Sequence, residues 1–258
     1  MLGKLYTFVA ENGFNLEKPL VDVIIPAFNE EKSIHLVLAA LPKQWIREAI
    51  VCNNGSTDQT ANVARQAGAT VVDQPLKGYG NACLAGIDYL QRKHQKPDIV
   101  VFLDGDYSDY PEETPDLLRP IWEGGCDMVI GSRALGVRQR GAMTPQQVFG
   151  NWLATTLMRW LYQYHFTDLG PFRAIKYDKL LELQMDDKNY GWTVEMQVKA
   201  AMLGLKCQEI PVKYRRRVGV SKVSGTVKGT IMAGYKILWT IFKLATKGVK
   251  TEEKFVAQ

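Results

Sequence analysis

Residues 100–113 read Val-Val-Phe-Leu-Asp-Gly-Asp-Tyr-Ser-Asp-Tyr-Pro-Glu-Glu, and this stretch decides how the rest of the chain is interpreted. The apolar run that stops at Asp104 and Asp106 predicts a buried strand followed by an acidic loop. The Pro-Glu-Glu that comes next is typical of a helix start. The acidic pair would therefore lie at the carboxyl end of a strand, where open parallel sheets bind their ligands.

Two carboxylates this close in sequence are suited to a metal ion. They repel each other unless a cation lies between them, and oxygen ligands suit Mg²⁺ or Mn²⁺ better than softer metals. The pair thus indicates half of a site for a cation and a diphosphate. A polar turn that caps the following helix would use the same residue types, so the stretch alone leaves both interpretations open.

The composition bounds the class of protein. The chain has 258 residues, enough for one large domain or for one domain with an appendage. Its net charge is +5, and the basic residues concentrate in the last fifth, which suits phosphates, an anionic membrane surface or nucleic acid. The four cysteines lie far apart, a pattern that favours a reducing compartment over a disulfide framework or a zinc site.

Neither a signal peptide nor a membrane span is predicted. The first residues lack a sustained apolar core after a basic start, and no uncharged run approaches the span length of about twenty residues. We therefore expect a cytoplasmic protein, either soluble or peripheral on the cytoplasmic face of a membrane.

Short apolar runs alternate with stretches of helical spacing along the first half of the chain. Helices are expected at residues 31–41, up to residue 67, and at 82–91. The predicted strands are 21–26, where Pro26 breaks the run, 48–52, 70–73, 99–103 and 128–132. This alternation predicts an α/β fold with a mostly parallel sheet covered by helices on both faces.

Polar loops follow the first four predicted strands, and they carry Asn29, Asn54, Lys77 and Asp104. Because the carboxyl ends of parallel strands share one edge of a sheet, these residues would converge on one crevice that can bind a nucleotide. Each loop alone is better explained as a turn or a cap, but the agreement in position of four loops reverses this preference and favours the site. Phosphate-loop and dinucleotide-binding glycine motifs are both missing, which excludes the usual NTPase and dehydrogenase readings.

Six motifs, in this order, resemble the family 2 glycosyltransferases, which have the GT-A fold. They are Pro26-Ala27-Phe28-Asn29-Glu30, Asn54-Gly55-Ser56-Thr57-Asp58, Asp104-Gly105-Asp106, Gly131-Ser132-Arg133, the Asp-Leu-Gly-Pro-Phe-Arg-Ala of residues 168–174, and the Arg-Val-Gly-Val-Ser-Lys of residues 217–222. Within the family, the sequence is most similar to polyprenyl-phosphate (dolichyl-phosphate) mannosyl- and glucosyltransferases. These enzymes move a sugar from GDP-mannose or UDP-glucose to a lipid phosphate.

The resemblance implies a GT-A domain over residues 1–225, with residues 226–258 as a basic amphipathic helix and tail. It implies a divalent cation, Mg²⁺ or Mn²⁺, held by Asp104 and Asp106 on the diphosphate. Arg133 would face the departing diphosphate or the acceptor phosphate. The residues implied for the base and ribose are Pro26, Ala27, Asn29, Glu30, Asn54 and Asp58. Lys77 and Gly78 would lie beside the nucleotide. Arg217, Ser221 and Lys222 would lie on a loop that closes over the phosphates.

The chain departs from the family pattern at two of these positions. Where the family often has Asp-Asp-Gly-Ser, residues 53–56 read Asn-Asn-Gly-Ser, so a carboxylate that could accept hydrogen bonds from guanine is missing. The donor base is therefore undetermined. Ser108 stands where many relatives have Gln.

The chemistry suggests a phosphate acceptor. The cation and Arg133 would stabilise the leaving diphosphate, and one direct displacement would invert the anomeric carbon. Family members that glycosylate hydroxyl groups supply a carboxylate base before a late helix, where this chain has Trp192. A phosphate monoester is already ionised near neutral pH and needs no base, so we expect a polyprenyl-phosphate acceptor.

Alternatives stay open at this point. Asp168 and Glu195 could each act as a base for a hydroxyl of a soluble or glycan acceptor, although Asp168 could also pair with Arg173, and Glu195 could be structural within a helix at 193–203. A non-catalytic nucleotide-sugar-binding module is a second class. A sugar nucleotidyltransferase would need an Arg-containing glycine-rich loop after the first strand, and nucleic-acid binding would rest on three adjacent arginines alone.

Two later stretches, residues 148–164 and 227–247, carry apolar and aromatic residues at helical spacing. Such a stripe is typical of a helix that packs on a core. Lysines opposite the second stripe are equally typical of a helix that lies on a membrane surface. We expect a C-terminal amphipathic helix with one of these two roles.

Overall fold

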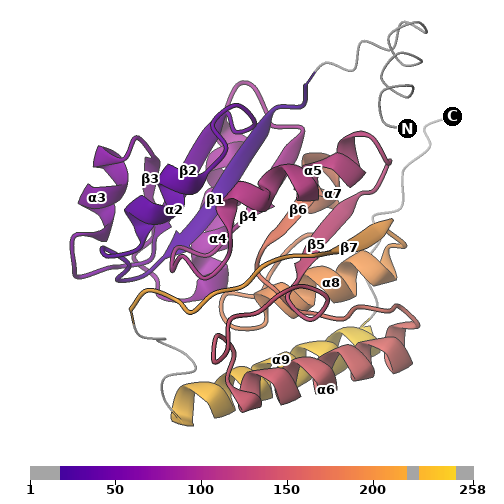
Figure 1. Cartoon of the computed structure of the whole chain (residues 1–258). Coiled ribbons are helices and arrows are strands. Elements are labelled where there is room, and N and C mark those ends of the chain that lie inside the picture. Colours follow the sequence, from indigo (N-terminus) through magenta and orange to yellow (C-terminus); the bar gives the residue numbers. More distant parts are fainter. Residues whose placement is uncertain (1–17, 220–226, 248–258) are drawn as a thin grey trace, which may run out of the picture.

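The computed structural model describes residues 18–219 and 227–247, which form a seven-stranded sheet between layers of helices (Figure 1). The strand order is β3-β2-β1-β4-β6-β5-β7. The strands are β1 (Val21–Ala27), β2 (Glu48–Asn53), β3 (Thr70–Asp73), β4 (Ile99–Phe102), β5 (Met128–Ser132), β6 (Arg173–Lys176) and β7 (Cys207–Pro211).

The sheet is mixed but mostly parallel. β1 pairs in parallel with β2 and β4, and β2 pairs in parallel with β3, so the carboxyl ends of these four strands share one edge. β6 runs antiparallel to both of its neighbours, β4 and β5, whereas β5 and β7 are parallel. The predicted α/β fold, with its mostly parallel sheet, is confirmed.

Helices cover both faces of the sheet, and this explains why all seven residues of β1 are buried. Val23 and Ile25 belong to the apolar cluster on one face, while Ile24 belongs to the cluster on the other. The first face carries α2 (Ile34–Ala40), α3 (Thr60–Gln66) and α5 (Thr114–Trp122). The second carries α4 (Tyr79–Arg92), α6 (Pro145–Tyr162), α7 (Tyr177–Glu182), α8 (Trp192–Met202) and α9 (Val227–Lys247).

The observed bounds differ from the predicted ones mainly at helix starts. The first helix begins at Ile34 rather than at residue 31, because residues 31–33 form a turn. The Pro-Glu-Glu forms a short 3₁₀ turn, η1 (Pro111–Glu113), that leads into α5. α4 begins at Tyr79 rather than at residue 82, because the left-handed φ of Gly78 ends the loop directly before the helix.

The last described helix, α9, packs along α6 and against α8 (Figure 1). Ile241 of α9 is fully buried, and its carbonyl accepts a hydrogen bond from the Tyr162 hydroxyl at the end of α6. The inner face of the predicted C-terminal helix is therefore part of the apolar core. Among the described residues, no helix combines the length and the apolar character that crossing a membrane requires.

Candidate active site

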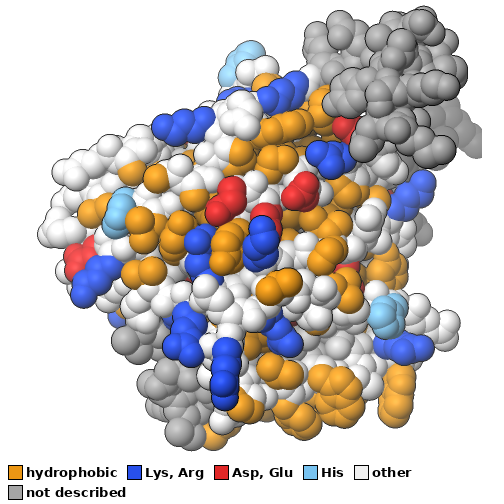
Figure 2. Space-filling view, in the orientation of Figure 1, with side chains coloured by type: hydrophobic (Ala, Val, Ile, Leu, Met, Phe, Trp, Pro, Cys, Tyr) orange, Lys and Arg blue, Asp and Glu red, His pale blue; other side chains and the backbone are white. Residues whose placement is uncertain are grey.

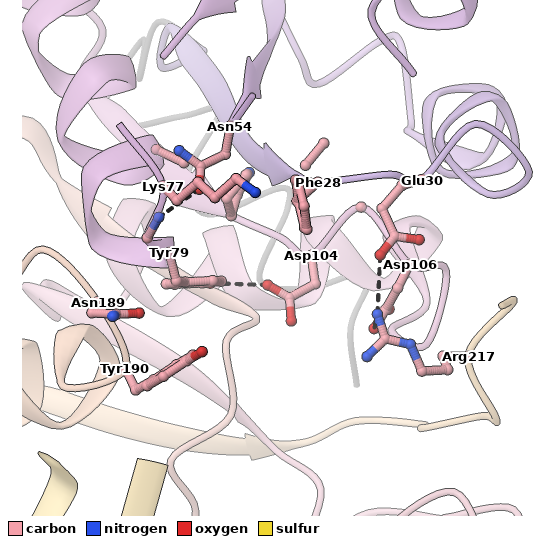
Figure 3. Close-up of a pocket in the computed structure, with 15 residues that line it drawn as sticks. Phe28, Glu30, Asn54, Lys77, Tyr79, Asp104, Asp106, Asn189, Tyr190 and Arg217 are labelled. Carbon is pink, nitrogen blue, oxygen red and sulfur yellow. Dashed lines mark hydrogen bonds and ion pairs between the residues drawn. The ribbon is translucent and has the colours of Figure 1, made fainter. Parts of the chain in front are cut away.

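A cavity of about 320 Å³ lies at the carboxyl ends of β1, β2 and β4 (Figure 3). The loops after β1, β2, β3 and β4 and the start of α4 form most of its wall, and the segment before α8 closes it from the opposite side. The lining residues are Pro26, Ala27, Phe28, Glu30, Asn54, Lys77, Gly78, Tyr79, Ala82, Asp104, Gly105, Asp106, Asn189, Tyr190 and Arg217.

Amide and hydroxyl side chains join the first three loops. The backbone N–H of Asn29 donates to the Ser56 hydroxyl at 3.0 Å, and the Asn29 side-chain oxygen accepts from the N–H of Thr57 at 2.8 Å. The buried Asn54 side chain accepts from the N–H of Gly78 at 2.7 Å and donates to the Leu76 carbonyl, also at 2.7 Å. These bonds fix the relative positions of the loops after β1, β2 and β3.

The two carboxylates of the acidic pair are held by different neighbours. Asp104 accepts a hydrogen bond from the Tyr79 hydroxyl at 2.9 Å. Asp106 is buried, and one of its oxygens accepts from the N–H and the hydroxyl of Ser108 at 2.8 and 2.5 Å. Burial and the neighbouring Asp106 raise the pKa of the Asp104 carboxyl to about 7.

Two cationic side chains border the same cavity. Arg217 Nη2 lies 3.1 Å from Oδ2 of Asp106 and 3.0 Å from Oε1 of Glu30. Lys77 Nζ lies 5.1 Å from the ring centre of Phe28, within range of a cation–π interaction. An anionic ligand would therefore meet one cation at each side of the acidic pair (Figure 3).

The donor set around the acidic pair fits a divalent cation bound together with a phosphate ligand. Among the described residues, no group of three or more His, Cys, Asp and Glu side chains could hold a metal ion by itself. Mg²⁺ in nucleotide sites is usually bound by one or two carboxylates and completed by phosphate oxygens and water. Asp104 and Asp106 supply two carboxylates, and the pKa of Asp104 is raised first by burial and then by repulsion from Asp106, which such a cation would relieve.

Arg133 and Asp168 form a buried ion pair outside the lining of the cavity. The guanidinium donates to the two carboxylate oxygens at 2.8 and 2.7 Å, and the backbone N–H of Arg133 adds a bond of 2.7 Å. Asp168 is 1 % exposed and Arg133 is 9 % exposed. Of the alternatives left open for Asp168, pairing with an arginine is observed, but the partner is Arg133, whereas Arg173 donates to the backbone carbonyls of Gly170 and Thr193.

Comparison with known proteins identifies the family. The family model for glycosyl transferase family 2 matches residues 22–183. The chain belongs to this family. Over 216 residues, which are 83 % of the chain, the glycosyltransferase is 35 % identical to an uncharacterised glycosyltransferase of Mycobacterium tuberculosis and spans 94 % of that protein.

Two further relatives have more specific names. Over 223 residues, or 80 % of the chain, the glycosyltransferase is 30 % identical to the undecaprenyl-phosphate mannosyltransferase of Micrococcus luteus and spans 88 % of it. Over 207 residues, or 78 % of the chain, it is 31 % identical to the dolichyl-phosphate hexose transferase of Haloferax volcanii and spans 85 % of it.

Solved structures confirm the GT-A fold. The glycosyltransferase superposes on glucosyl-3-phosphoglycerate synthase from Mycobacterium tuberculosis, crystallised with Mn²⁺, UDP and phosphoglyceric acid, with a TM-score of 0.70 and 21 % identity. The match covers 97 % of this chain and 84 % of that one. At this identity the likeness establishes the fold alone.

The fold brings most of the predicted site residues of the glycosyltransferase together. Those that line the cavity are Pro26, Ala27, Glu30, Asn54, Lys77, Gly78, Asp104, Asp106 and Arg217. Those described but outside its lining are Asn29, Asp58, Arg133, Asp168 and Glu195. Ser221 and Lys222 lie outside the described residues. The individual roles remain predictions.

Two of the residues outside the lining have clear structural partners. Asp58 accepts from the backbone N–H groups of Thr60 and Glu31 at 3.0 and 3.2 Å, so it caps one loop and ties it to another. Glu195 is 4 % exposed and accepts from the N–H groups of Asp186 and Asp187. Its carboxylate also lies 2.7 Å from Lys199 Nζ.

Three polar residues that the sequence does not single out, Tyr79, Asn189 and Tyr190, also line the cavity. Tyr79 stands inside a glycine-containing loop that the sequence did mark, and the two flanking glycines were the only signal for it. Asn189 and Tyr190 come from a segment far along the chain, and no sequence motif indicates that they line the cavity.

Proposed function

We propose that the glycosyltransferase moves a hexose from a nucleotide sugar, UDP-glucose or GDP-mannose, to a polyprenyl phosphate, with a divalent cation held by Asp104 and Asp106. The observation that carries the proposal is the meeting of the acidic pair, two cationic side chains and the ends of three strands in one cavity. Structures of a protein with the same fold contain Mn²⁺ and UDP.

The cavity residues suggest how the leaving group is stabilised. A cation on Asp104 and Asp106 would neutralise the charge that develops on the diphosphate as the glycosidic bond breaks. Arg217 already contacts Asp106 at 3.1 Å, so its guanidinium is within reach of a diphosphate bound at that carboxylate. The Arg133 guanidinium donates to Asp168, and we propose that this ion pair positions the loop after β5.

The carboxylates that border the cavity bear on the class of acceptor that the enzyme uses. These are Glu30, Asp104 and Asp106; Glu30 contacts Arg217, and the other two are the proposed cation ligands. Trp192 occupies the position of the usual base and is 1 % exposed, and Glu195 is held by backbone N–H groups. A phosphate acceptor needs no base, and direct attack by its oxygen would invert the anomeric carbon. The two relatives named for lipid-phosphate acceptors support the same reading.

The outer faces of α6 and α9 suggest where such an acceptor is met. Figure 2 shows hydrophobic side chains gathered at the lower end of the molecule, where Figure 1 places these two helices. Their large exposed apolar residues are Val148, Phe149, Trp152, Trp160, Leu161, Ile231, Met232, Tyr235, Trp239 and Phe242. We propose that this face lies on the cytoplasmic surface of a membrane, in the manner of an interfacial amphipathic helix.

The test is sugar transfer from labelled UDP-glucose and GDP-mannose into a detergent-dispersed polyprenyl phosphate, with and without Mn²⁺ or Mg²⁺. We expect metal-dependent label in the lipid that the D106N variant does not produce. D116N is the matched control, because Asp116 lies on α5 with its side chain 61 % exposed and forms only a surface ion pair with Arg119. D116N should keep the wild-type unfolding midpoint, and D106N should remain folded at the assay temperature, as checked by its own unfolding curve.

Other outcomes separate the alternatives. Metal-dependent hydrolysis of the donor, without labelled lipid, would refute the lipid-phosphate acceptor and favour a hydroxyl of a soluble or glycan acceptor. Binding of the donor without turnover toward any acceptor or water would favour a nucleotide-sugar-binding module.

A further inference from the structure

The segment of residues 186–191 lies between the cavity and α9, and it supplies Asn189 and Tyr190 to the cavity wall. It carries no regular secondary structure except a turn at its end. A short loop of this kind holds its side chains in place only if its backbone is fixed by neighbouring elements. Three helices fix it here.

The first contact is with α8. The Glu195 carboxylate accepts from the backbone N–H of Asp186 at 3.1 Å and of Asp187 at 2.8 Å. Lys199 then joins Glu195 to the chain before the segment, because its Nζ lies 2.7 Å from the carboxylate and donates to the Gln184 carbonyl at 2.6 Å. These bonds anchor the start of the segment.

The second contact is with the start of α4, at the cavity itself. A Cβ at Gly80 would lie 1.9 Å from the Asp187 carbonyl oxygen, and a Cβ at Gly78 would lie 2.2 Å from that of Lys188. Only glycine permits so close an approach of two backbones. The N–H of Asn81 also donates to the Lys188 carbonyl at 3.0 Å. The segment is thus fixed relative to Tyr79, which contacts Asp104.

The third contact is with α9. Lys236 Nζ lies 2.9 Å from Oδ2 of Asp187, whose side chain is only 6 % exposed. The other oxygen of Asp187 accepts from the N–H groups of Asn189 and Gly191, at 2.7 and 3.1 Å. One carboxylate therefore links the helix to the backbone on both sides of Tyr190.

Figure 3 indicates which part of a donor this segment would meet. Asn54, Lys77 and Phe28 lie on one side of Asp104, and Asn189 and Tyr190 lie on the other. A nucleotide sugar with its base by the first group and its diphosphate at the acidic pair would extend its sugar toward the second. An aromatic ring with a hydroxyl, beside an amide with two donors and an acceptor, suits the apolar face and the hydroxyl groups of a hexose.

We propose that Asn189 and Tyr190 bind the hexose of the nucleotide sugar, and that Lys236 of α9 positions them through Asp187. The proposal rests on the proposed function, since it assigns the sugar end of the same donor site. It makes α9 a determinant of sugar binding, in addition to any contact that its outer face makes.

The experiment compares the affinities of UDP-glucose with UDP, and of GDP-mannose with GDP, by titration calorimetry of the full chain with Mn²⁺. We expect Y190A and N189A to weaken binding of the sugar nucleotide by about tenfold, as expected for the loss of one good contact, and to leave the free nucleotide within about twofold. K236M should do the same, and K236R should restore the wild-type ratio because it keeps the ion pair.

The matched control is K243M on the same helix, since Lys243 forms no ion pair with any other described residue. An unchanged ratio of the two affinities in Y190A and N189A would overturn the sugar assignment. A lower unfolding midpoint in K236M with the ratio unchanged would reduce Lys236 to a structural role. If wild-type protein bound none of the four nucleotides, the proposed function would fail and this inference with it.

Discussion

Removal of one hydroxyl group, in the variant Y79F, tests how the acidic pair is prepared for a cation. The Tyr79 hydroxyl donates to Asp104 at 2.9 Å, and this bond lowers the pKa of a carboxyl that burial and Asp106 raise to about 7. Burial and the neighbouring Asp104 raise the pKa of Tyr79 well above its usual value, so the phenol stays a donor near neutral pH. Phenylalanine keeps the ring and its packing but loses the donor.

The expected size follows from the strength of a hydrogen bond to an ionised group. Such a bond contributes about 1.5–3 kcal/mol, and one pKa unit corresponds to about 1.4 kcal/mol, so the pKa of Asp104 should rise by about one to two units. At pH 7 the ionised fraction would then fall from about one half to about one tenth or less. Because the cation requires the ionised carboxylate, we expect metal-dependent nucleotide binding to weaken about fivefold or more at that pH.

The assay is the binding of a fluorescent UDP or GDP analogue as a function of Mg²⁺, repeated between about pH 6 and 9. The sign is fixed by linkage: a raised carboxyl pKa moves the onset of metal binding to higher pH, so the loss in Y79F should be large at pH 7 and small at pH 9. The control is Y89F, which removes a hydroxyl that donates to Glu48 at 2.9 Å, away from the cavity. A defect in Y79F of equal size at every pH would refute the protonation argument.

Two further predictions concern the buried Arg133–Asp168 ion pair and the exposed apolar face of α6 and α9. D168N should lower the free energy of unfolding by about 3–5 kcal/mol, because it leaves the buried charge of Arg133 without its partner. Urea denaturation measures this change. A variant that is as stable as the wild type but has no transfer activity would instead make Asp168 the base. Trp160 and Trp239 are 77 % and 52 % exposed. Their replacement with serine should reduce co-sedimentation with anionic vesicles by about tenfold or more. Unchanged binding would contradict a membrane role for α6 and α9.

The first five strands along the chain could be predicted because their signals are local. β3 and β5 have the predicted bounds, and β2 and β4 differ from theirs by one residue at the carboxyl end. Each is a short apolar run followed by polar residues, and burial on both faces makes such runs unambiguous. The antiparallel insertion of β6 between β4 and β5 depends on pairing across many intervening residues, which local periodicity does not encode.

Some residues of the site could likewise be predicted from local signals, and others could not. Asn54, Asp104 and their neighbouring loops follow strands whose order fixes where they end, so their convergence follows from the topology. Tyr190 reaches the cavity only because Gly80 permits the backbone of its segment to approach α4. The arginine that pairs with Asp168 could not be identified for a related reason. The nearest arginine in sequence, Arg173, points to backbone carbonyls, whereas Arg133 arrives from β5.

The two faces of α9 have different environments, and this constrains how the helix can act. Its inner face places Thr240 and Ile241 in the interior, and Lys236 reaches the segment that carries Tyr190. Its outer face exposes Tyr235 and Trp239, whose rings stack at 6.4 Å. Because a helix moves as a rigid unit over this length, a surface bound by the outer face would act on the segment through the contacts of the inner face, which include the Lys236–Asp187 ion pair and the approach of Thr240 to Gly191. K236M should then weaken any effect of vesicles on sugar-nucleotide affinity while vesicle binding itself persists.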